Sequence, residues 1–281
     1  MAAFRYVVAD VFTDTPLEGN QVAVFTDARD LAEETLQPLA RELNYSETVF
    51  VYPAENDGHA RIRIFTPAVE VPFAGHPMLG TAFVLAAPLQ LGEIKLETGM
   101  GTVPVLLERE GARIVFGRMS QPIPSVEQYP AEAELLGALG VERSELPVEL
   151  YDNGLRHVYV CLPSPDAVAA LRPDLGRLGE LDAVLGINTF AGSGTAWKTR
   201  MFAPSGGVAE DPATGSAAGP LCVHLVRHGL VQPGVEIEIV QGVEIKRPSK
   251  LYARVGGTPE RIESVEVGGS AVVVARGEFR L

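Results

Sequence analysis

The sequence predicts an α+β fold made of two similar halves. Three observations lead to this prediction: strand-like segments outnumber helical ones, helical segments occur singly between them, and a glycine-led segment recurs about half a chain later. With 281 residues, of which 46% are hydrophobic, the chain is long enough for two domains with substantial cores.

The charge balance excludes some partners and locations. The chain carries 23 Lys and Arg against 36 Asp and Glu, a net charge of −13, which disfavours nucleic acid because phosphates would be repelled. No apolar run reaches the ~18 residues of a membrane span. The opening residues MAAFRYVVADVF place Asp10 where a secretory signal would stay apolar, so we expect a cytoplasmic protein without a membrane partner. Cys161 and Cys222 lie in apolar surroundings typical of buried, reduced thiols.

The first half alternates strands with two helices. Runs rich in β-branched and aromatic residues, separated by turn residues, predict strands at 4–12, 21–26, 47–53 and 59–66. Glycine turns divide residues 93–119 into three more strands. Apolar periodicity predicts helices at 31–44, despite Pro38, and at 76–88.

The second half repeats this style. It is predicted to contain helices at 131–140 and 216–229, and strands at 155–162, 235–240, 250–255, 261–267 and 271–277. The polar, proline-containing stretch 119–130 is the natural linker. We therefore expect an N-terminal domain at 1–118 and a C-terminal domain at 131–281, with the last strand as a candidate to return to the first domain.

An internal repeat supports this division. The segment IFTPAVEVPFAGHPMLGTAFVL resembles MFAPSGGVAEDPATGSAAGPLCVHL, so that Phe65 aligns with Phe202 and His76 with Ser216. Chance similarity between segments rich in glycine, proline and alanine is the alternative. A unit that recurs at half the chain length favours two pseudo-equivalent domains.

Each copy of the repeat ends a strand, turns at a glycine and begins a small apolar helix. Pro77 suits a first helical turn, and Thr214 or Ser216 can cap the second helix. A helix start offers unpaired N–H groups that hold anions, although a glycine before a helix is often only a turn. If a pseudo-twofold relates the halves, the two helix starts would grip a small carboxylate substrate between them.

The remaining motifs point to chemistry by side chains alone. There is no dinucleotide fingerprint, and the phosphate-loop-like segment 191–199 has Trp197 where glycine is needed. His224 and His228 lack an accompanying metal motif, so we expect neither a metal nor a cofactor.

Four residues near the repeats are candidates for acid–base work: Glu47, His76, Glu210 and Asp211. The helix start lowers the tendency of His76 to be cationic, which favours a neutral donor. For Glu47 the alternative is a charge at a strand edge.

Several long strings in the chain resemble the PhzF family of phenazine-biosynthesis isomerases, relatives of diaminopimelate epimerase in fold. They include DVFTDTPLEGNQVAVF, RIRIFTPAVEVPFAGHPMLGTA, NGLRHVYV, RMFAPSGGVAEDPATGSAAGPL and IVQGVEIKRPS. The resemblance implies two domains, each a curved, mostly antiparallel sheet around a central helix, with the active site between them, and it implies a homodimer.

The resemblance also implies a reaction and its residues. The family isomerises trans-2,3-dihydro-3-hydroxyanthranilate by moving a proton from C3 to C1. By position, Glu47 matches the acid/base residue, and His76 and Asp211 match residues that hold polar groups of the substrate and support developing charge. The implied substrate-binding residues are Asn20, Gly75, Thr214, Gly215 and Ser216. The epimerase relatives use two cysteines, and neither corresponding stretch here contains one.

Two other functions stay open at this point. The chain could be an isomerase or epimerase of another small amino or hydroxy acid on the same fold. It could also be a non-catalytic protein that binds a small ligand.

Overall fold

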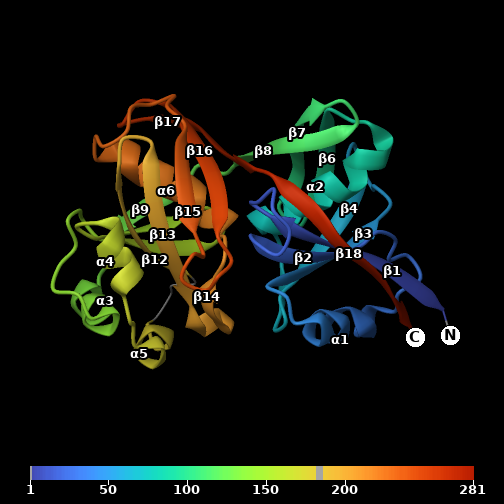
Figure 1. Ribbon diagram of the computed structural model, residues 1–281, viewed down its shortest axis with the longest axis horizontal. Coiled ribbons are helices and arrows are strands. Elements are labelled where there is room, and N and C mark those ends of the chain that lie inside the picture. The colour runs from blue at the N-terminus through green and yellow to red at the C-terminus, as the bar shows by residue number, and fades with distance from the viewer. Residues whose placement is uncertain (1, 182–185) are drawn as a thin grey trace. The chain divides into compact units, whose positions relative to one another are not determined.

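The structure, a computed structural model, describes residues 2–181 and 186–281 (Figure 1). The chain forms two compact units, one from Met1–Ser120 with Gly268–Leu281 and the other from Gln121–Val267. Among the described residues, no helix has the length and apolarity required to cross a membrane.

The first unit is a mostly antiparallel sheet with two helices. In chain order its elements are β1 (Ala3–Val11), β2 (Asn20–Phe25), α1 (Glu33–Leu43), β3 (Glu47–Tyr52), β4 (Ala60–Phe65), β5 (Glu70–Val71), α2 (Gly75–Leu89), β6 (Glu93–Thr98), β7 (Gly101–Glu110), β8 (Arg113–Gln121) and β18 (Ala271–Arg280). The pairs β2–β3 and β4–β6 are parallel, and β18–β1, β1–β2, β3–β4, β6–β7 and β7–β8 are antiparallel.

The second unit repeats this order. Its elements are β9 (Ser125–Gln128), α3 (Glu132–Leu139), β10 (Glu149–Asp152), β11 (Arg156–Cys161), α4 (Pro165–Ala170), α5 (Leu175–Gly179), β12 (Gly186–Ser193), β13 (Ala196–Ala203), a 3-10 turn η1 (Pro204–Gly206), β14 (Val208–Asp211), α6 (Gly215–Arg227), β15 (Ile237–Gln241), β16 (Ser249–Gly257) and β17 (Ile262–Gly269). The pairs β11–β12 and β13–β15 are parallel, whereas β10–β11, β12–β13 and β15–β16 are antiparallel.

The alternation of parallel and antiparallel pairs is therefore the same in both units. It confirms the α+β fold with two pseudo-symmetric halves. A parallel pair needs a crossover connection, which α1 supplies between β2 and β3, and α4 with α5 between β11 and β12.

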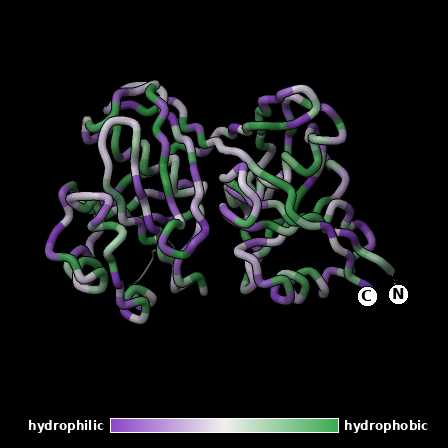
Figure 2. The backbone as a smooth tube through the Cα atoms, viewed as in Figure 1, coloured by the Kyte–Doolittle hydropathy of each residue, from purple (hydrophilic) through white to green (hydrophobic). Residues whose placement is uncertain are grey.

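One central helix fills each sheet (Figure 1). Every residue from Gly75 to Phe83 in α2 is buried, as is every residue from Gly215 to Val226 in α6. A helix that is apolar all round belongs in an interior. Hydropathy instead alternates along the strand β16, in which buried residues take turns with more exposed ones (Figure 2).

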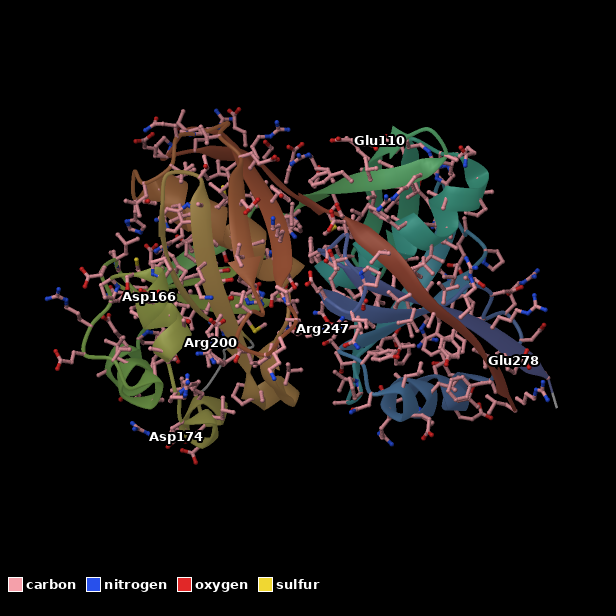
Figure 3. The ribbon with its side chains drawn as sticks, in the orientation of Figure 1. Glu110, Asp166, Asp174, Arg200, Arg247 and Glu278 are labelled. Atoms are coloured by element: carbon pink, nitrogen blue, oxygen red, sulfur yellow. The ribbon has the colours of Figure 1, made fainter. Side chains whose placement is uncertain are left out.

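The second unit has charged side chains both at its surface and in its interior (Figure 3). In the second unit, Asp166 and Asp174 are exposed at the ends of short helices. Arg200 on β13 is instead only 6% exposed and lies within the unit. A buried arginine requires a partner, which the next subsection describes.

One boundary differs from that expected, and the last strand returns to the first unit as the sequence allowed. The stretch 119–130, expected as a linker, contains the end of β8 and the strand β9, which pairs with β10. The last strand, β18, pairs with β1 and clusters with the first unit.

The four helices predicted from periodicity are present as α1, α2, α3 and α6, with ends shifted by no more than two residues. The strands β12 and β13 were not predicted, because Asn, Thr and Gly residues interrupt the pattern of β12. Tertiary burial overrides this weak propensity: the first six residues of β12 are all buried. The rejected phosphate-loop segment 191–199 is the hairpin that joins these two strands.

Candidate functional site

The first unit brings three predicted site residues together. Asn20 begins β2 and Glu47 begins β3, and because these strands are parallel, both starts lie at one edge of the sheet. His76 is the second residue of α2 and reaches the same place, directly after Gly75. Its Nε2 lies 3.2 Å from Glu47 Oε2, and its Nδ1 lies 3.4 Å from Asn20 Nδ2. We call these three side chains the first cluster.

The contacts of His76 define its protonation. Burial lowers the pKa of His76 to about 3, so the ring is neutral near pH 7. Nε2 also lies 3.2 Å from the Gln21 carbonyl oxygen, an acceptor, whereas the amide nitrogen facing Nδ1 is a donor. The hydrogen therefore belongs on Nε2, which donates toward Gln21 and Glu47. His76 is a neutral donor beside the carboxylate.

Exposure separates the roles of the three side chains. Asn20 is fully buried and His76 is 4% exposed. The Glu47 side chain is 17% exposed, and its oxygen Oε2, which faces His76, is buried. Glu47 is therefore the most accessible member of the first cluster.

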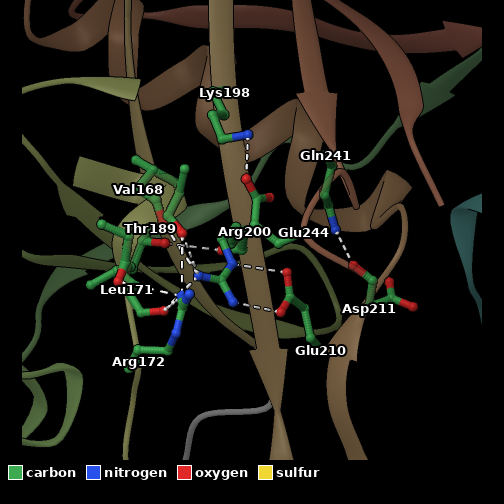
Figure 4. A network of polar contacts seen from close by, with 12 residues as sticks. Val168, Leu171, Arg172, Thr189, Lys198, Arg200, Glu210, Asp211, Gln241 and Glu244 are labelled. Atoms are coloured by element: carbon green, nitrogen blue, oxygen red, sulfur yellow. Dashed lines mark hydrogen bonds and ion pairs between the residues drawn. The ribbon is translucent and has the colours of Figure 1, made fainter. Parts of the chain in front are cut away.

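The second unit brings together a loop around Asp211 and the start of α6. Thr214 Oγ1 donates to Asp211 Oδ2 at 2.6 Å. Gln241, the last residue of β15, holds both ends of this loop: its Nε2 donates to the Asp211 carbonyl at 2.9 Å and to Thr214 Oγ1 at 3.0 Å, and its Oε1 accepts from the Thr214 N–H at 3.3 Å. Figure 4 shows the contact of Gln241 with Asp211.

The start of α6 is held by side chains from β8, from β11 and from the turn between β10 and β11. Gln121 Nε2 donates to the Gly215 carbonyl at 2.8 Å, and Asn153 Nδ2 donates to the Ser216 carbonyl at 2.9 Å. His157 Nε2 lies 3.1 Å from Ser216 Oγ. We call Asp211, Thr214, Gly215 and Ser216 the second cluster.

The expected helix cap is not formed. Thr214 does occupy the position before α6, but its side chain caps no backbone N–H of the helix. Its hydroxyl is instead directed to the Asp211 carboxylate, a stronger, charged acceptor. Ala74, the residue before α2, offers no capping side chain either. The first N–H groups of both helices thus receive no capping side chain from the preceding residue.

Glu210, a candidate acid–base residue in the sequence, has a structural role. Arg200 donates to its two carboxylate oxygens, from Nε at 2.9 Å and from a terminal nitrogen at 2.7 Å (Figure 4). The remaining terminal nitrogen of Arg200 donates to the Leu171 carbonyl at 2.9 Å, just beyond α4. Both carboxylate oxygens of Glu210 are thus bound by one buried guanidinium, so Asp211 is the better candidate of this pair for contact with a substrate.

The residues that sequence reasoning missed are Gln241, His157 and Asn153. Each acts on the second cluster from a segment that is distant in the chain: Asn153 from the turn after β10, His157 from β11 and Gln241 from the end of β15. The strings NGLRHVYV and IVQGVEIKRPS carried the resemblance without indicating which of their residues face the site.

One group elsewhere has the composition of a metal site. His224 Nδ1 and His228 Nε2 lie 3.2 and 3.0 Å from Glu149 Oε2. Arg227 donates to the same oxygen at 3.0 Å and Tyr151 at 2.8 Å. A guanidinium already supplies the cation beside this carboxylate, so the group is better described as an ionic network that ties α6 to β10.

Comparison with known proteins agrees with this arrangement. Residues 9–277 match the family described as phenazine biosynthesis-like protein. The chain is 53% identical over 277 residues, covering 99% of both chains, to trans-2,3-dihydro-3-hydroxyanthranilate isomerase of Pseudomonas aeruginosa. A PhzF-family phenazine biosynthesis protein of Bacillus anthracis has the same fold, with a TM-score of 0.87, 25% identity and full coverage of both chains.

More distant structures share the fold alone. A hydroxyproline epimerase from Agrobacterium vitis covers 98% of this chain, and this chain covers 92% of it, with a TM-score of 0.68 and 13% identity. This confirms the epimerase-like fold expected from the sequence. Together, the full-length family match and the close isomerase relative show that the chain belongs to the PhzF family of phenazine biosynthesis-like proteins.

Proposed function

We propose that the protein is a trans-2,3-dihydro-3-hydroxyanthranilate isomerase of phenazine biosynthesis that works without a cofactor. The observation that carries the substrate assignment is the 53% identity to an enzyme of that name over 99% of both chains. The observation that supports the mechanism is the partly exposed Glu47 side chain beside a buried neutral histidine.

Glu47 is proposed to carry the proton. Its carboxylate takes the proton from C3 of the ring, which leaves the electron pair delocalised in the ring system. The resulting carboxylic acid returns the same proton to C1, giving an enol that tautomerises to the amino-ketone. His76, as a neutral Nε2–H donor, orients the carboxylate and does not exchange the proton itself.

The internal repeat favours a single proton carrier. The repeat aligns Phe65 with Phe202, which lie opposite Thr48 and Ile187 in the sheet. The residue before each of these partners is Glu47 in the first unit and Gly186 in the second. Gly186 thus occupies the position equivalent to Glu47, and a glycine has no side chain that could exchange a proton. The second unit therefore offers no second carboxylate base at this position.

The thiols do not supply two-base chemistry either. Cys161 and Cys222 are both buried, and burial raises the pKa of Cys161 to about 11 and that of Cys222 to about 12. A thiol needs a lowered pKa to act as a base near neutral pH. A racemase that uses two cysteines is accordingly not the reaction we propose.

The second cluster is proposed to bind the polar groups of the substrate. Thr214 and Gln241 hold the Asp211 loop, and Asp211 is only 7% exposed, so its geometry is fixed before a ligand arrives. Ser216 and the first N–H groups of α6 are suited to a carboxylate. The family resemblance further leads us to propose a cytoplasmic homodimer, which light scattering would test against the chain mass of 30.0 kDa.

The experiment that tests the proposal is turnover of the dihydro-hydroxyanthranilate by wild-type protein and by Glu47→Gln. We expect the variant to lose at least about 100-fold in kcat, the low end of general acid–base catalysis. Binding of 3-hydroxyanthranilate, the aromatic analogue, should be largely kept. Glu34→Gln, the same change at an exposed position of α1, is the control and should keep full activity. Full turnover by Glu47→Gln would show that another group carries the proton.

A further inference from the structure

The second unit contains a buried histidine, His157, for which the proposed function gives no role. It is the second residue of β11 and is fully buried. Its Nε2 lies 3.1 Å from Ser216 Oγ in the first turn of α6. A fully buried imidazole that contacts a proposed substrate-binding hydroxyl is a candidate for a positioning residue.

The first unit contains a comparable contact, made from a different strand position. His157 lies opposite Gly186 in the pair β11–β12, as Val22 lies opposite Glu47 in the pair β2–β3, so His157 is equivalent to Val22. The strand residue that contacts the helix start is Asn20 in the first unit and His157 in the second.

The two units exchange the residue types at this contact. In the first unit the helix supplies the imidazole of His76 and the strand supplies an amide. In the second unit the strand supplies the imidazole and the helix supplies the hydroxyl of Ser216. Each helix start thus carries a polar side chain that contacts a polar side chain near the beginning of the corresponding strand, β2 or β11.

Hydrogen bonds around His157 indicate which ring nitrogen carries the hydrogen. Asn188 Nδ2 donates to the carbonyls of Val158 at 3.3 Å and Gly186 at 3.2 Å, which fixes the orientation of this amide. The same Nδ2 lies 3.5 Å from His157 Nδ1. A hydrogen on Nδ1 would point at the hydrogens of the amide, so Nδ1 is the bare nitrogen and Nε2 carries the hydrogen.

The ring is also neutral. Burial lowers the pKa of His157 to about 4, although Asp152 favours the charged form. A neutral ring with its hydrogen on Nε2 donates to Ser216 Oγ. The oxygen of Ser216 then acts as the acceptor in this bond, and its own hydrogen is left for another acceptor.

The packing around the ring is specific to an imidazole. A Cβ on Gly186 would lie 2.3 Å from His157 Nδ1, so only glycine at that position leaves room for the ring. Asn153 fixes the backbone of Ser216 through its carbonyl at the same time. Both the ring and the serine that it contacts are held from several sides.

We propose that His157 is a positioning residue that makes Ser216 a hydrogen-bond donor to the substrate carboxylate. This inference rests on the proposed function only for the identity of the acceptor. The bond between the two side chains, and the tautomer behind it, can be tested without turnover.

The first experiment is nitrogen NMR of protein with ¹⁵N-labelled histidine, with His157→Gln used to assign the resonance. We expect His157 to be neutral at pH 7 with its hydrogen on Nε2. A hydrogen on Nδ1 would overturn the inference whether or not the protein is an isomerase.

The second experiment compares two amides of different reach. In His157→Gln the amide nitrogen lies where Nε2 of the histidine lay, so it can still donate to Ser216. In His157→Asn the side chain is shorter, and the amide nitrogen lies where Nδ1 lay, too far from Ser216 to donate. For His157→Asn we expect kcat/KM to fall about 10-fold, the effect of one lost hydrogen bond, and for His157→Gln less than about 3-fold.

Dependence on Ser216 distinguishes positioning from a general loss of structure. In the Ser216→Ala background, His157→Asn should cause no further loss of kcat/KM, because the hydroxyl that it positions is absent. An equal loss in both backgrounds would overturn the inference.

If the wild-type protein does not turn over the proposed substrate, the proposed function fails, and the NMR result still decides the tautomer. If His157→Asn does not fold, the tautomer and the activity of His157→Gln decide the matter.

Discussion

The buried ion pair between Arg200 and Glu210 should be a major contributor to the stability of the second unit. The two side chains are 7% and 9% exposed, and two hydrogen bonds of 2.9 and 2.7 Å join them. Arg200 also donates to the carbonyls of Val168, Ala169 and Leu171 (Figure 4). Replacing Glu210 by Gln would leave the guanidinium buried with only neutral partners.

Two independent estimates give the same magnitude for Glu210→Gln. Unit charges about 3.5 Å apart interact by roughly 5 kcal/mol at an effective dielectric constant of 20. Removing one partner of a buried ion pair costs about 3–5 kcal/mol in measured cases. Because glutamine can still accept one hydrogen bond, we expect the free energy of unfolding to fall by about 3 kcal/mol.

Tryptophan fluorescence during denaturant unfolding measures this loss. The chain has one tryptophan, Trp197, which is buried on the same strand as Arg200, so its emission reports on the second unit. Glu127→Gln is the matched control, because the ion pair between Arg156 and Glu127 in the same unit is exposed and should contribute less than about 1 kcal/mol.

The double variant tests the cause. In Arg200→Met with Glu210→Leu no charge is left buried, so this protein should be more stable than Glu210→Gln. A loss below about 1 kcal/mol for Glu210→Gln, or a double variant that is less stable than the single one, would refute the reasoning.

Three further predictions concern pH, the thiols and one glycine. The folded pKa of His157, about 4, is below its unfolded value of about 6.5, so stability is present above pH 6.5 and is lost as the pH falls toward 4. Between pH 7.5 and 5.5, His157→Gln should lose about 1.3 kcal/mol less than wild-type protein in denaturant unfolding; equal losses would show that folding does not change the pKa of His157. Cys161 and Cys222 should not react with Ellman's reagent in the native state and should both react in denaturant, since both are buried; rapid native labelling would contradict this. Gly242→Ala should lower both kcat/KM and the melting temperature, because φ is 76° and a Cβ would lie 2.3 Å from the Arg247 carbonyl and 2.6 Å from that of Pro212, inside the Asp211 loop. Gly234→Ala, at φ 82° with open space around it, is the control and should cost only about 1–2 kcal/mol of backbone strain.

Much of the fold could be predicted because local sequence patterns determine most of its helices and strands. Apolar periodicity located α1, α2, α3 and α6, and glycine turns divided 93–119 into β6, β7 and β8. The strand β12 was missed, since its Asn and Thr residues are buried by neighbours that come from elsewhere in the chain. The linker was misplaced for a similar reason: β9 looks polar, and only its pairing with β10 makes it a strand.

The sequence likewise predicted some residues of the candidate site and missed others. The sequence indicated that Glu47, His76 and Asp211 carry the chemistry, because each stands at a strand or helix end in a distinctive string. Residue type and position alone did not separate Asp211 from Glu210. The family resemblance selected Asp211, and the structure shows that Arg200 binds Glu210.

By itself the sequence determined the element types, the two-fold repetition and the family. The tertiary structure alone decided which residues orient the site: Gln241 on the Asp211 loop, His157 on Ser216 and Asn20 on His76. The physical reason is that side-chain direction repeats along a helix or strand with a fixed period, which the sequence pattern shows. Contact between elements that are distant in the chain depends instead on sheet register and helix packing. A hydrogen bond needs an accuracy of a few tenths of an ångström, and only the assembled sheet provides it.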